Sequence, residues 1–250
     1  MNIKVMTLNM WYGRYIDEVI EFIREERPDV VMLQEVTASR KIDIPHGISD
    51  SFELLMDRLK MQGVFAPGWR LILEGKLVGL GLATFTKLPI EYFGAKYYIK
   101  GVLESGDPSF GVNFPGFYLR TDVNTEVGVL PFITTHFFWS MYPEITDEQR
   151  LGAKLLKNEL SPISDFVLAG DFNVTDDSEI YREISKGLVD DRPEGLVRTL
   201  HPEIHKVGPS LDLAVDYMFH RGNRFRVKSS RVPIVPVSDH LPLVVEYEVE

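Results

Sequence analysis

The chain has 250 residues, a formal net charge of −10, 44% hydrophobic residues and no cysteine. This length and apolar content suffice for one sizeable core, so we predict a single domain over residues 1–250. The lack of cysteine excludes disulfides and thiolate metal sites, and the acidic balance is opposite to that of proteins that grip long nucleic acid non-specifically. No stretch approaches the ~20 apolar residues of a membrane span. We expect a protein that is cytoplasmic and monomeric.

The first elements along the chain form a strand, helix, strand pattern. Residues 3–9 alternate as in a strand, and apolar residues then recur at helical spacing from Ile16 to Ile23. Residues 30–33 are a continuous apolar run, which is typical of a strand buried on both faces. This order predicts a crossover unit with parallel strands.

The remainder of the chain is richer in strands than in helices. A second helix is predicted near 52–59, and the capping-box pattern at 146–149 predicts a helix that runs to about Leu160. Strands are predicted at 69–73, 79–85, 90–98, 116–122, 127–134, 166–169, 215–219, 225–232 and 243–249. Glycine and proline predict a long loop at 99–116. The mixture favours an α/β sandwich with mixed sheets.

Polar side chains interrupt or follow several of these strands. They are Asn9, Gln34-Glu35, Thr135-His136, Asp171 with Asn173, Asp216, and Asp239-His240. Ligands collect at strand ends in α/β proteins, and burying such groups is costly unless they are paired or bound to metal. Each alone is commonly a turn residue, a surface ion pair or a hydrogen-bonded structural histidine. Their joint occurrence favours a functional site.

Short segments between residues 7 and 242 occur in an order that a known enzyme family shares. They are Thr7-Leu8-Asn9, Leu33-Gln34-Glu35-Val36, the segment 82–90, Thr135-His136, Gly170-Asp171-Phe172-Asn173, Val215-Asp216-Tyr217 and Ser238-Asp239-His240-Leu241-Pro242. These segments resemble the successive signatures of the endonuclease/exonuclease/phosphatase superfamily. The resemblance implies a four-layer α/β/β/α sandwich with two mixed β-sheets and outer helices. It also implies a metal-dependent phosphodiesterase or phosphatase.

The expected cofactor is Mg²⁺, with Mn²⁺ as a substitute. Magnesium prefers hard oxygen ligands, usually one or two carboxylates, and keeps several waters. The resemblance implies that Glu35 is the main metal ligand, with Asn9 and Asp239 close by. A site without thiolates and with so few carboxylates suits Mg²⁺ or Mn²⁺ better than Zn²⁺.

The same resemblance implies roles for the other polar residues. Asp171 would orient and deprotonate the attacking water, and Asn173 would donate its amide to a phosphate oxygen. His240 would stabilise the transition state, with Asp216 hydrogen-bonded to its other ring nitrogen, and His136 would be a second phosphate contact. Asp171 as a ligand of a second ion remains the alternative, so one-metal and two-metal mechanisms both stay open.

Aromatic and basic residues near these segments are candidate substrate contacts. Trp11, Tyr12 and Trp139 fit a stacking rim for a base, a tyrosine or a sugar, with packing in the core as the alternative. Arg150 lies in the first turn of the capped helix, where a surface ion pair is the alternative.

The Thr-His form of the central segment looks closer to the branch that holds sphingomyelinases, inositol-phosphate phosphatases and tyrosyl-DNA phosphodiesterases. Apurinic-site endonucleases of the superfamily grip duplex DNA with basic loops, whereas the segment 98–118 carries only Lys100 against Glu104 and Asp107. We therefore expect a phosphate-ester substrate that is a small phosphodiester or a single-stranded nucleic acid. A DNA-repair-type endonuclease or exonuclease is the alternative.

Two functions of other classes fit less well. A serine hydrolase would need Ser238, Asp239 and His240 to act as a relay, but side chains of consecutive residues point apart and no Gly-x-Ser-x-Gly elbow occurs. A non-catalytic binding protein that retained the fold would be expected to lose part of the polar set, which is complete here.

Overall fold

The strands of the computed structural model assemble into two mixed sheets. The structure describes residues 1–39, 43–44, 47–48, 50–73, 76–105, 115–208 and 210–250. One sheet contains β1 (Asn2–Asn9), β2 (Val30–Ser39), β5 (Gln62–Leu73), β6 (Lys76–Thr86), β8 (Leu103–Ser105), β14 (Phe225–Arg231) and β15 (Leu243–Val249). The other contains β7 (Ile90–Ile99), β9 (Gly116–Thr125), β10 (Gly128–His136), β11 (Phe166–Asp171), β12 (Val189–Asp190) and β13 (Asp216–Arg221). Within the described residues, the strand orders are β14-β15-β1-β2-β6-β5-β8 and β12-β13-β11-β10-β9-β7.

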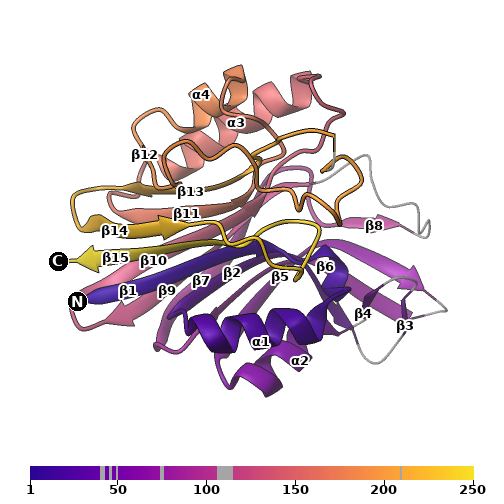
Figure 1. Cartoon of the computed structure of the whole chain (residues 1–250), viewed down its shortest axis with the longest axis horizontal. Helices are drawn as coiled ribbons and strands as arrows, with labels where there is room; N and C mark the ends of the chain where they lie inside the picture. The colour runs from indigo at the N-terminus through magenta and orange to yellow at the C-terminus, as the bar shows by residue number, and fades with distance from the viewer. Residues whose placement is uncertain (40–42, 45–46, 49, 74–75, 106–114, 209) are drawn as a thin grey trace.

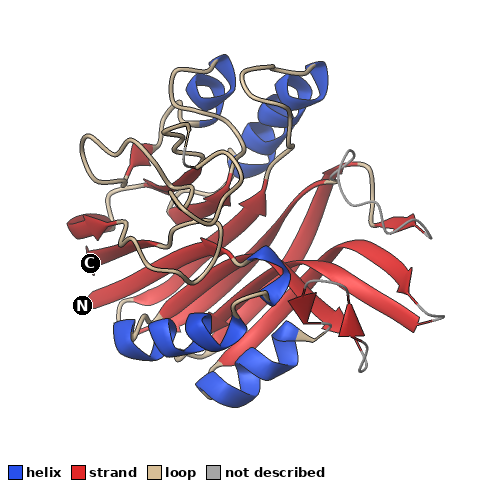
Figure 2. Ribbon diagram, turned by 45° about the vertical axis from the view of Figure 1, so that its right-hand side comes forward, coloured by secondary structure: helices blue, strands red, loops and turns tan. Residues whose placement is uncertain are grey.

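Helices cover the outer faces of the two sheets (Figures 1 and 2). The helices are η1 (Trp11–Gly13), α1 (Ile16–Glu26), α2 (Ser51–Leu59), α3 (Asp147–Leu160) and α4 (Glu179–Ile184), and a small hairpin joins β3 (Asp43–Ile44) to β4 (Gly47–Ile48). The pair α1 and α2 packs on the sheet that contains β1, and the pair α3 and α4 packs on the sheet that contains β11. The predicted four-layer sandwich is confirmed.

The side chains of β1 alternate between two hydrophobic cores, one on each face of its sheet. Ile3 and Val5 belong to the core between the sheets, whereas Met6 and Leu8 pack in the core beneath α1. Because side chains alternate along a strand, Asn9 falls in the same row as Ile3 and Val5. The last residue of β1 is therefore a polar group directed into the layer between the two sheets.

Most predicted elements are present, but β5 begins earlier than predicted, at Gln62, and several short elements were not predicted, among them η1, β3, β4 and β12. The capping box at the start of α3 forms, with Gln149 N–H donating to Thr146 Oγ1 (3.1 Å) and Thr146 N–H donating to Gln149 Oε1 (2.9 Å). Helix α4 was not predicted, since its six residues are too few to show helical periodicity. The predicted loop at 99–116 contains β8, and its residues 106–114 lie outside the described residues.

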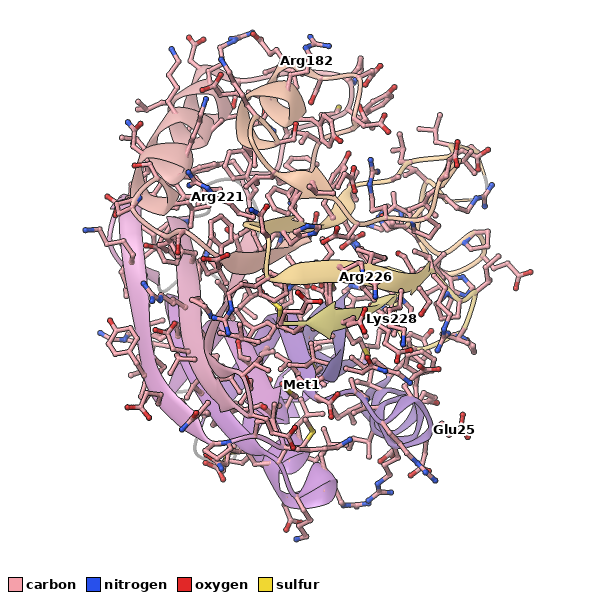
Figure 3. The ribbon with its side chains drawn as sticks, turned by 90° about the vertical axis from the view of Figure 1, so that its left-hand side faces the viewer. Met1, Glu25, Arg182, Arg221, Arg226 and Lys228 are labelled. Carbon is pink, nitrogen blue, oxygen red and sulfur yellow. The ribbon has the colours of Figure 1, made fainter. Side chains whose placement is uncertain are left out.

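The first residue of the chain marks the end of the sandwich that faces away from the polar strand ends. Figure 3 views the molecule from this side, where Met1 is labelled, and β1 carries the chain from there to Asn9 at the other end. The edge strand β14 bears exposed Arg226 and Lys228, charges that discourage pairing with another chain. Among the described residues, no helix is long and apolar enough to cross a membrane.

Candidate active site

Polar residues from both sheets meet at one end of the sandwich. Asn9 ends β1, His136 ends β10 and Asp171 ends β11, while Asp216 begins β13 and pairs with Asp171 across the antiparallel ladder. The pairs β1–β2 and β10–β11 are parallel, so their carboxyl ends meet at the same edge. None of these four residues is more than 5% exposed. Burial of so many polar groups requires mutual hydrogen bonds or a bound ion.

Asn9 connects the two sheets at this edge. Its Nδ2 donates to Glu35 Oε1 and to Asp171 Oδ2, both at 3.1 Å, and its Oδ1 accepts from the Trp11 N–H at 3.1 Å. Glu35 belongs to the sheet of β1 and Asp171 to the other sheet. One amide side chain therefore fixes the relative positions of two carboxylates that are 136 residues apart in the chain (171 minus 35).

Glu35 lies in a β-bulge of β2. The pairing of β2 with β6 shifts between Leu33 and Val36, where three steps along β2 face two along β6. Glu35 itself has φ 56, a left-handed conformation that is uncommon for a residue with a side chain. Bulges re-aim side chains and backbone strain gathers at functional sites, so this local geometry directs Glu35 toward the polar cluster.

The carboxylate of Glu35 is only partly compensated, since Asn9 donates to one of its two oxygens. Its Oε2 has no hydrogen-bond partner among the described residues, and no described Lys or Arg forms an ion pair with it. Burial, followed by the neighbouring Asp239 carboxylate, raises the pKa of Glu35 from its ordinary 4.5 to about 8. A buried carboxylate oxygen without a donor is what a hard divalent cation would satisfy. The residues expected to hold Mg²⁺ therefore fit that ion.

Two residues of the segment Gly170-Asp171-Phe172-Asn173 serve packing. A Cβ on Gly170 would lie 1.9 Å from the carbonyl oxygen of Thr135, so only glycine allows β10 and β11 to approach this closely. The Phe172 ring packs edge-on against Tyr217 in the core beneath α3, with centroids 5.5 Å apart. These two residues hold the intervening Asp171 at the end of β11.

The second half of that segment fixes the Asp171 carboxylate. The Asn173 N–H donates to Asp171 Oδ1 at 2.9 Å, and Asn173 Nδ2 donates to the carbonyl oxygen of Phe137 at 3.1 Å. Asn173 has φ 54, which asparagine tolerates better than most residues. Both oxygens of Asp171 thus accept a hydrogen bond, Oδ1 from Asn173 and Oδ2 from Asn9.

Two histidines approach the same oxygen of Asp171. His136 Nε2 lies 3.4 Å and His240 Nε2 lies 3.8 Å from Asp171 Oδ2, and His240 Nδ1 is 2.9 Å from Asp216 Oδ2. Burial acts to lower the pKa of His240, but the carboxylates of Asp216 and Asp171 outweigh it and raise that pKa well above its usual value. Burial lowers the pKa of His136. The surroundings therefore shift the pKa values of these two imidazoles in opposite directions.

Ser238 anchors the segment that carries Asp239 and His240. Its Oγ lies 2.7 Å from the Asn9 carbonyl oxygen, to which it donates, and 3.2 Å from Asp239 Oδ1. The hydroxyl thus ties this segment to the end of β1. This structural role gives no support to a nucleophilic serine.

Trp11 and Tyr12 lie close to the polar cluster, in consecutive left-handed conformations with φ 44 and 56. The guanidinium of Arg14 covers one face of the Trp11 ring, 4.3 Å from its centroid. Tyr12 packs against the small core cluster around Trp69, and burial, followed by the charges of Glu35 and Asp239, raises its pKa. Tyr12 is therefore a neighbour of the predicted metal ligands.

Trp139 and Arg150 have a weaker connection to the cluster. Trp139 is 50% exposed on the loop that follows β10. Arg150 forms ion pairs with Asp147 (2.7 Å) and Glu179 (2.8 Å), which links α3 to the start of α4. No described contact joins Arg150 to the polar cluster, and its role in substrate binding stays a prediction.

Three residues of this region had no role assigned from the sequence. Gln34 Nε2 donates to Thr7 Oγ1 (3.1 Å) and to Thr134 Oγ1 (2.9 Å), which joins the sheets directly behind Asn9. Thr199 Oγ1 accepts the Asp216 N–H at 3.0 Å, and His205 stacks edge-on against His240. The sequence feature that could have indicated a role for His205 is that two of the six histidines lie within the segment 201–205.

A small pocket adjoins the cluster. Glu35 and His136 line it on the polar side, and its remaining wall is formed by Gly68, Trp69, Leu80, Gly81, Leu82 and Phe117. The pocket is therefore polar at Glu35 and His136 and mostly apolar elsewhere.

The raised pKa of Glu35 predicts that the metal-free protein loses stability as the pH rises. The carboxyl group holds its proton more tightly in the folded state, so its stabilising contribution is complete below about pH 4.5 and is lost as the pH passes 8. This difference corresponds to about 4–5 kcal/mol at most. Urea unfolding in a chelator at pH 5 and pH 9 measures it: Glu35→Gln should match wild type at pH 5 and exceed it at pH 9. Equal pH dependence in the two proteins would contradict the assignment.

Solved structures share this fold across nearly the whole chain. An endonuclease/exonuclease/phosphatase from Bacteroides vulgatus superposes with TM-score 0.75 at 20% identity, covering 100% of both chains. The human nocturnin catalytic domain with bound sulfate anion gives TM-score 0.67 at 18% identity, covering 100% of this chain and 94% of that one. A Bacteroides thetaiotaomicron mannosyl-6-phosphatase gives TM-score 0.69 at 16% identity, covering 98% and 99% of the two chains.

The sequence comparisons bear on the family. No curated protein matches this chain. The model of the endonuclease/exonuclease/phosphatase family matches residues 6–240, a range that runs from β1 to His240 and contains every polar residue of the cluster. The chain therefore belongs to the endonuclease/exonuclease/phosphatase family.

Proposed function

We propose that this chain is a Mg²⁺-dependent phosphodiesterase, with Mn²⁺ as a substitute ion. Members of its family are hydrolases that act on phosphoester bonds, typically with a divalent metal. The observation that carries the proposal is the pair of hydrogen bonds from Asn9 Nδ2 to Glu35 and Asp171. This amide holds the expected metal ligand and the expected base in one fixed arrangement, as phosphoester hydrolysis requires.

Asp171 is the proposed base. Its two oxygens each accept one hydrogen bond within the protein, and each retains a lone pair to receive a proton from the attacking water. The carboxylate is 1% exposed and held from two sides, so it needs little reorganisation when the reaction occurs. Asn173, fixed next to it, can orient a phosphate oxygen with its second amide hydrogen.

His240 is the proposed electrostatic stabiliser of the transition state. Asp216 accepts from Nδ1 and leaves the Nε2–H directed toward Asp171, the place where the phosphoryl group would meet the water. A protonated imidazole there donates to oxygens that gain negative charge. His136, on the same side of Asp171, supplies a second contact.

Glu35, Asn9 and Asp239 would hold the metal. A magnesium ion bound there would supply Lewis-acid charge that screens the phosphoryl oxygens and the leaving oxygen. Asn9 contributes by orienting Glu35, and Asp239 adds the second carboxylate that raises the pKa of Glu35 in the metal-free protein. The alternative in which Asp171 binds a second ion uses the same residues.

The proposed substrate is a small phosphodiester or a single-stranded nucleic acid, with one substituent beside the small pocket at Glu35 and His136. The net charge of −10 disfavours a long duplex partner. Trp11, Tyr12 and Trp139 remain the proposed aromatic contacts for that substituent.

Turnover of a substrate panel with Mg²⁺ tests this proposal. Bis-p-nitrophenyl phosphate should be hydrolysed faster than p-nitrophenyl phosphate, and a single-stranded 5′-tyrosyl oligonucleotide faster than duplex abasic DNA. A phosphosugar and a sphingomyelin analogue complete the panel. A protein that cleaved duplex abasic DNA best would be a repair-type endonuclease, and one that cleaved only monoesters would be a phosphatase.

A further inference from the structure

The segment that precedes β13 is attached to the catalytic segment through its backbone. Leu200 and His240 form an isolated antiparallel bridge, and the His201 N–H donates to the Asp239 carbonyl oxygen at 2.8 Å. These contacts place the loop 199–208 alongside the two residues that the proposed function uses for metal and phosphate binding. A side chain from this loop is therefore held at a fixed place beside the site.

That side chain is His205. One of its ring nitrogens, a ring nitrogen of His240 and a carboxylate oxygen of Asp239 lie within 4.8 Å of one another. The rings of His205 and His240 are perpendicular, with centroids 5.9 Å apart. The loop is tight around it, since the His205 N–H donates to the His201 carbonyl oxygen and a Cβ on Gly208 would lie 2.1 Å from that oxygen.

A backbone contact fixes the protonation of the His205 ring. The Val207 N–H donates to His205 Nδ1 at 3.2 Å, so a neutral ring carries its hydrogen on Nε2. Within the described part of the chain, the hydrogen bond of the His205 ring is the one at Nδ1, and Nε2 makes none to the protein. A nitrogen that bears hydrogen is a donor and offers no lone pair to a metal.

The carboxylates around His205 would repel an anionic phosphoryl group, so its binding depends on hydrogen-bond donors and on the metal. The cluster contains four carboxylates, those of Glu35, Asp171, Asp216 and Asp239, and no Lys or Arg of the described residues forms an ion pair with any of them. Besides the amide of Asn173, an anionic phosphoryl group would therefore be bound by the metal and by neutral or cationic imidazoles.

We propose that His205 is a third phosphate-binding histidine, whose Nε2–H donates to a non-bridging oxygen of the phosphoester beside His240. This inference rests on the proposed function, because it assumes that the cluster receives a phosphoryl group. The proposal gives His205 a role in the recognition of phosphate oxygens, although His205 lies outside the short segments that resemble the family signatures. His136 and His240 approach Asp171 Oδ2, and His205 adds a donor near Asp239.

Two substitutions separate the donor from the loop structure. In His205→Asn, the Oδ1 can still accept from the Val207 N–H and preserve the turn, but the donor at the Nε2 position is lost. In His205→Gln, an amide N–H reaches about as far as Nε2. Calorimetric titration of inorganic phosphate into Mg²⁺-saturated protein should show about ten- to hundredfold weaker binding for His205→Asn, and a change below threefold for His205→Gln. Lys206→Gln removes an exposed neighbouring charge and should change the affinity less than twofold.

Phosphate binding as strong in His205→Asn as in wild type, or as weak in His205→Gln as in His205→Asn, would overturn the donor role. A wild-type protein that bound phosphate but hydrolysed no ester would contradict the proposed function and leave this comparison valid. A wild-type protein that bound no phosphate would overturn both. Thermal unfolding of each variant shows whether a weak binder is folded.

Discussion

Asp171→Asn should lower the turnover of bis-p-nitrophenyl phosphate by about 10²- to 10⁴-fold at saturating Mg²⁺, because the site would lose its general base. The substitution keeps the size of the side chain, and its Oδ1 can still accept from the Asn173 N–H. At the other position, an amide group would meet the Asn9 amide, a donor facing a donor, at a cost of about 1–3 kcal/mol. The fold should therefore persist while catalysis is lost.

The exposed Asp147 provides the matched control. Its side chain is 99% exposed and pairs only on the surface with Arg150, so Asp147→Asn should retain wild-type turnover. Circular dichroism and thermal unfolding of both variants establish that they are folded. Near-wild-type turnover by Asp171→Asn at saturating Mg²⁺ would show that Asp171 is not the base.

Glu35→Gln should weaken Mg²⁺ binding by on the order of 100-fold or more, since even residues that only orient metal ligands contribute 10- to 100-fold. The variant keeps an oxygen that can accept from Asn9 Nδ2, so the hydrogen bond between the sheets persists. Removing a poorly solvated carboxylate charge, whose second oxygen has no donor, should at the same time stabilise the metal-free fold above pH 8. The same substitution is thus expected to improve stability and to impair function.

Calorimetric titration of Mg²⁺, or electron paramagnetic resonance of bound Mn²⁺, measures this effect. Glu25→Gln on the exposed face of α1 is the control, with wild-type metal affinity expected. If Glu35→Gln bound Mg²⁺ as tightly as wild type, Asp239 and the other carboxylates would have to form the metal site without it.

The strand ends are the part of the site that could be predicted from the sequence. Asn9, His136 and Asp171 follow apolar strands, and the period of two places them in the rows that face the core between the sheets. Parallel pairing of β1 with β2 and of β10 with β11 then brings them to one edge. Local pattern and topology agree at these residues, which is why their convergence could be expected.

The remaining features depend on tertiary contacts that leave no local pattern. The bulge at Glu35 arises where β6 pairs with β2, and no residue type marks it in the sequence. The position of His205 follows from backbone contacts between the loop 199–208 and the segment that carries His240. Gln34 joins two sheets through a threonine that is 100 residues distant in the chain. Each feature joins segments that are far apart in the chain, so neither segment alone indicates it.

Tyr12 illustrates how the same residue type can serve two purposes. The aromatic run after Asn9 predicted a stacking surface, and the structure packs Tyr12 into the small cluster around Trp69 while keeping it close to Glu35 and Asp239. Next to these carboxylates, the Tyr12 hydroxyl can donate a hydrogen bond, which phenylalanine could not. Proximity to the predicted metal ligands is thus an additional reason for a tyrosine at this position.

Hydrolysis of bis-p-nitrophenyl phosphate by metal-stripped protein during a Mg²⁺ titration tests the central claim most directly. Without metal, the rate should equal that of the buffer; it should rise to saturation with Mg²⁺ or Mn²⁺, fall to the buffer rate with excess EDTA, and recover when Mg²⁺ is added again. Hydrolysis at the same rate in EDTA as in Mg²⁺ would contradict a metal-dependent site built on Glu35 and Asp171.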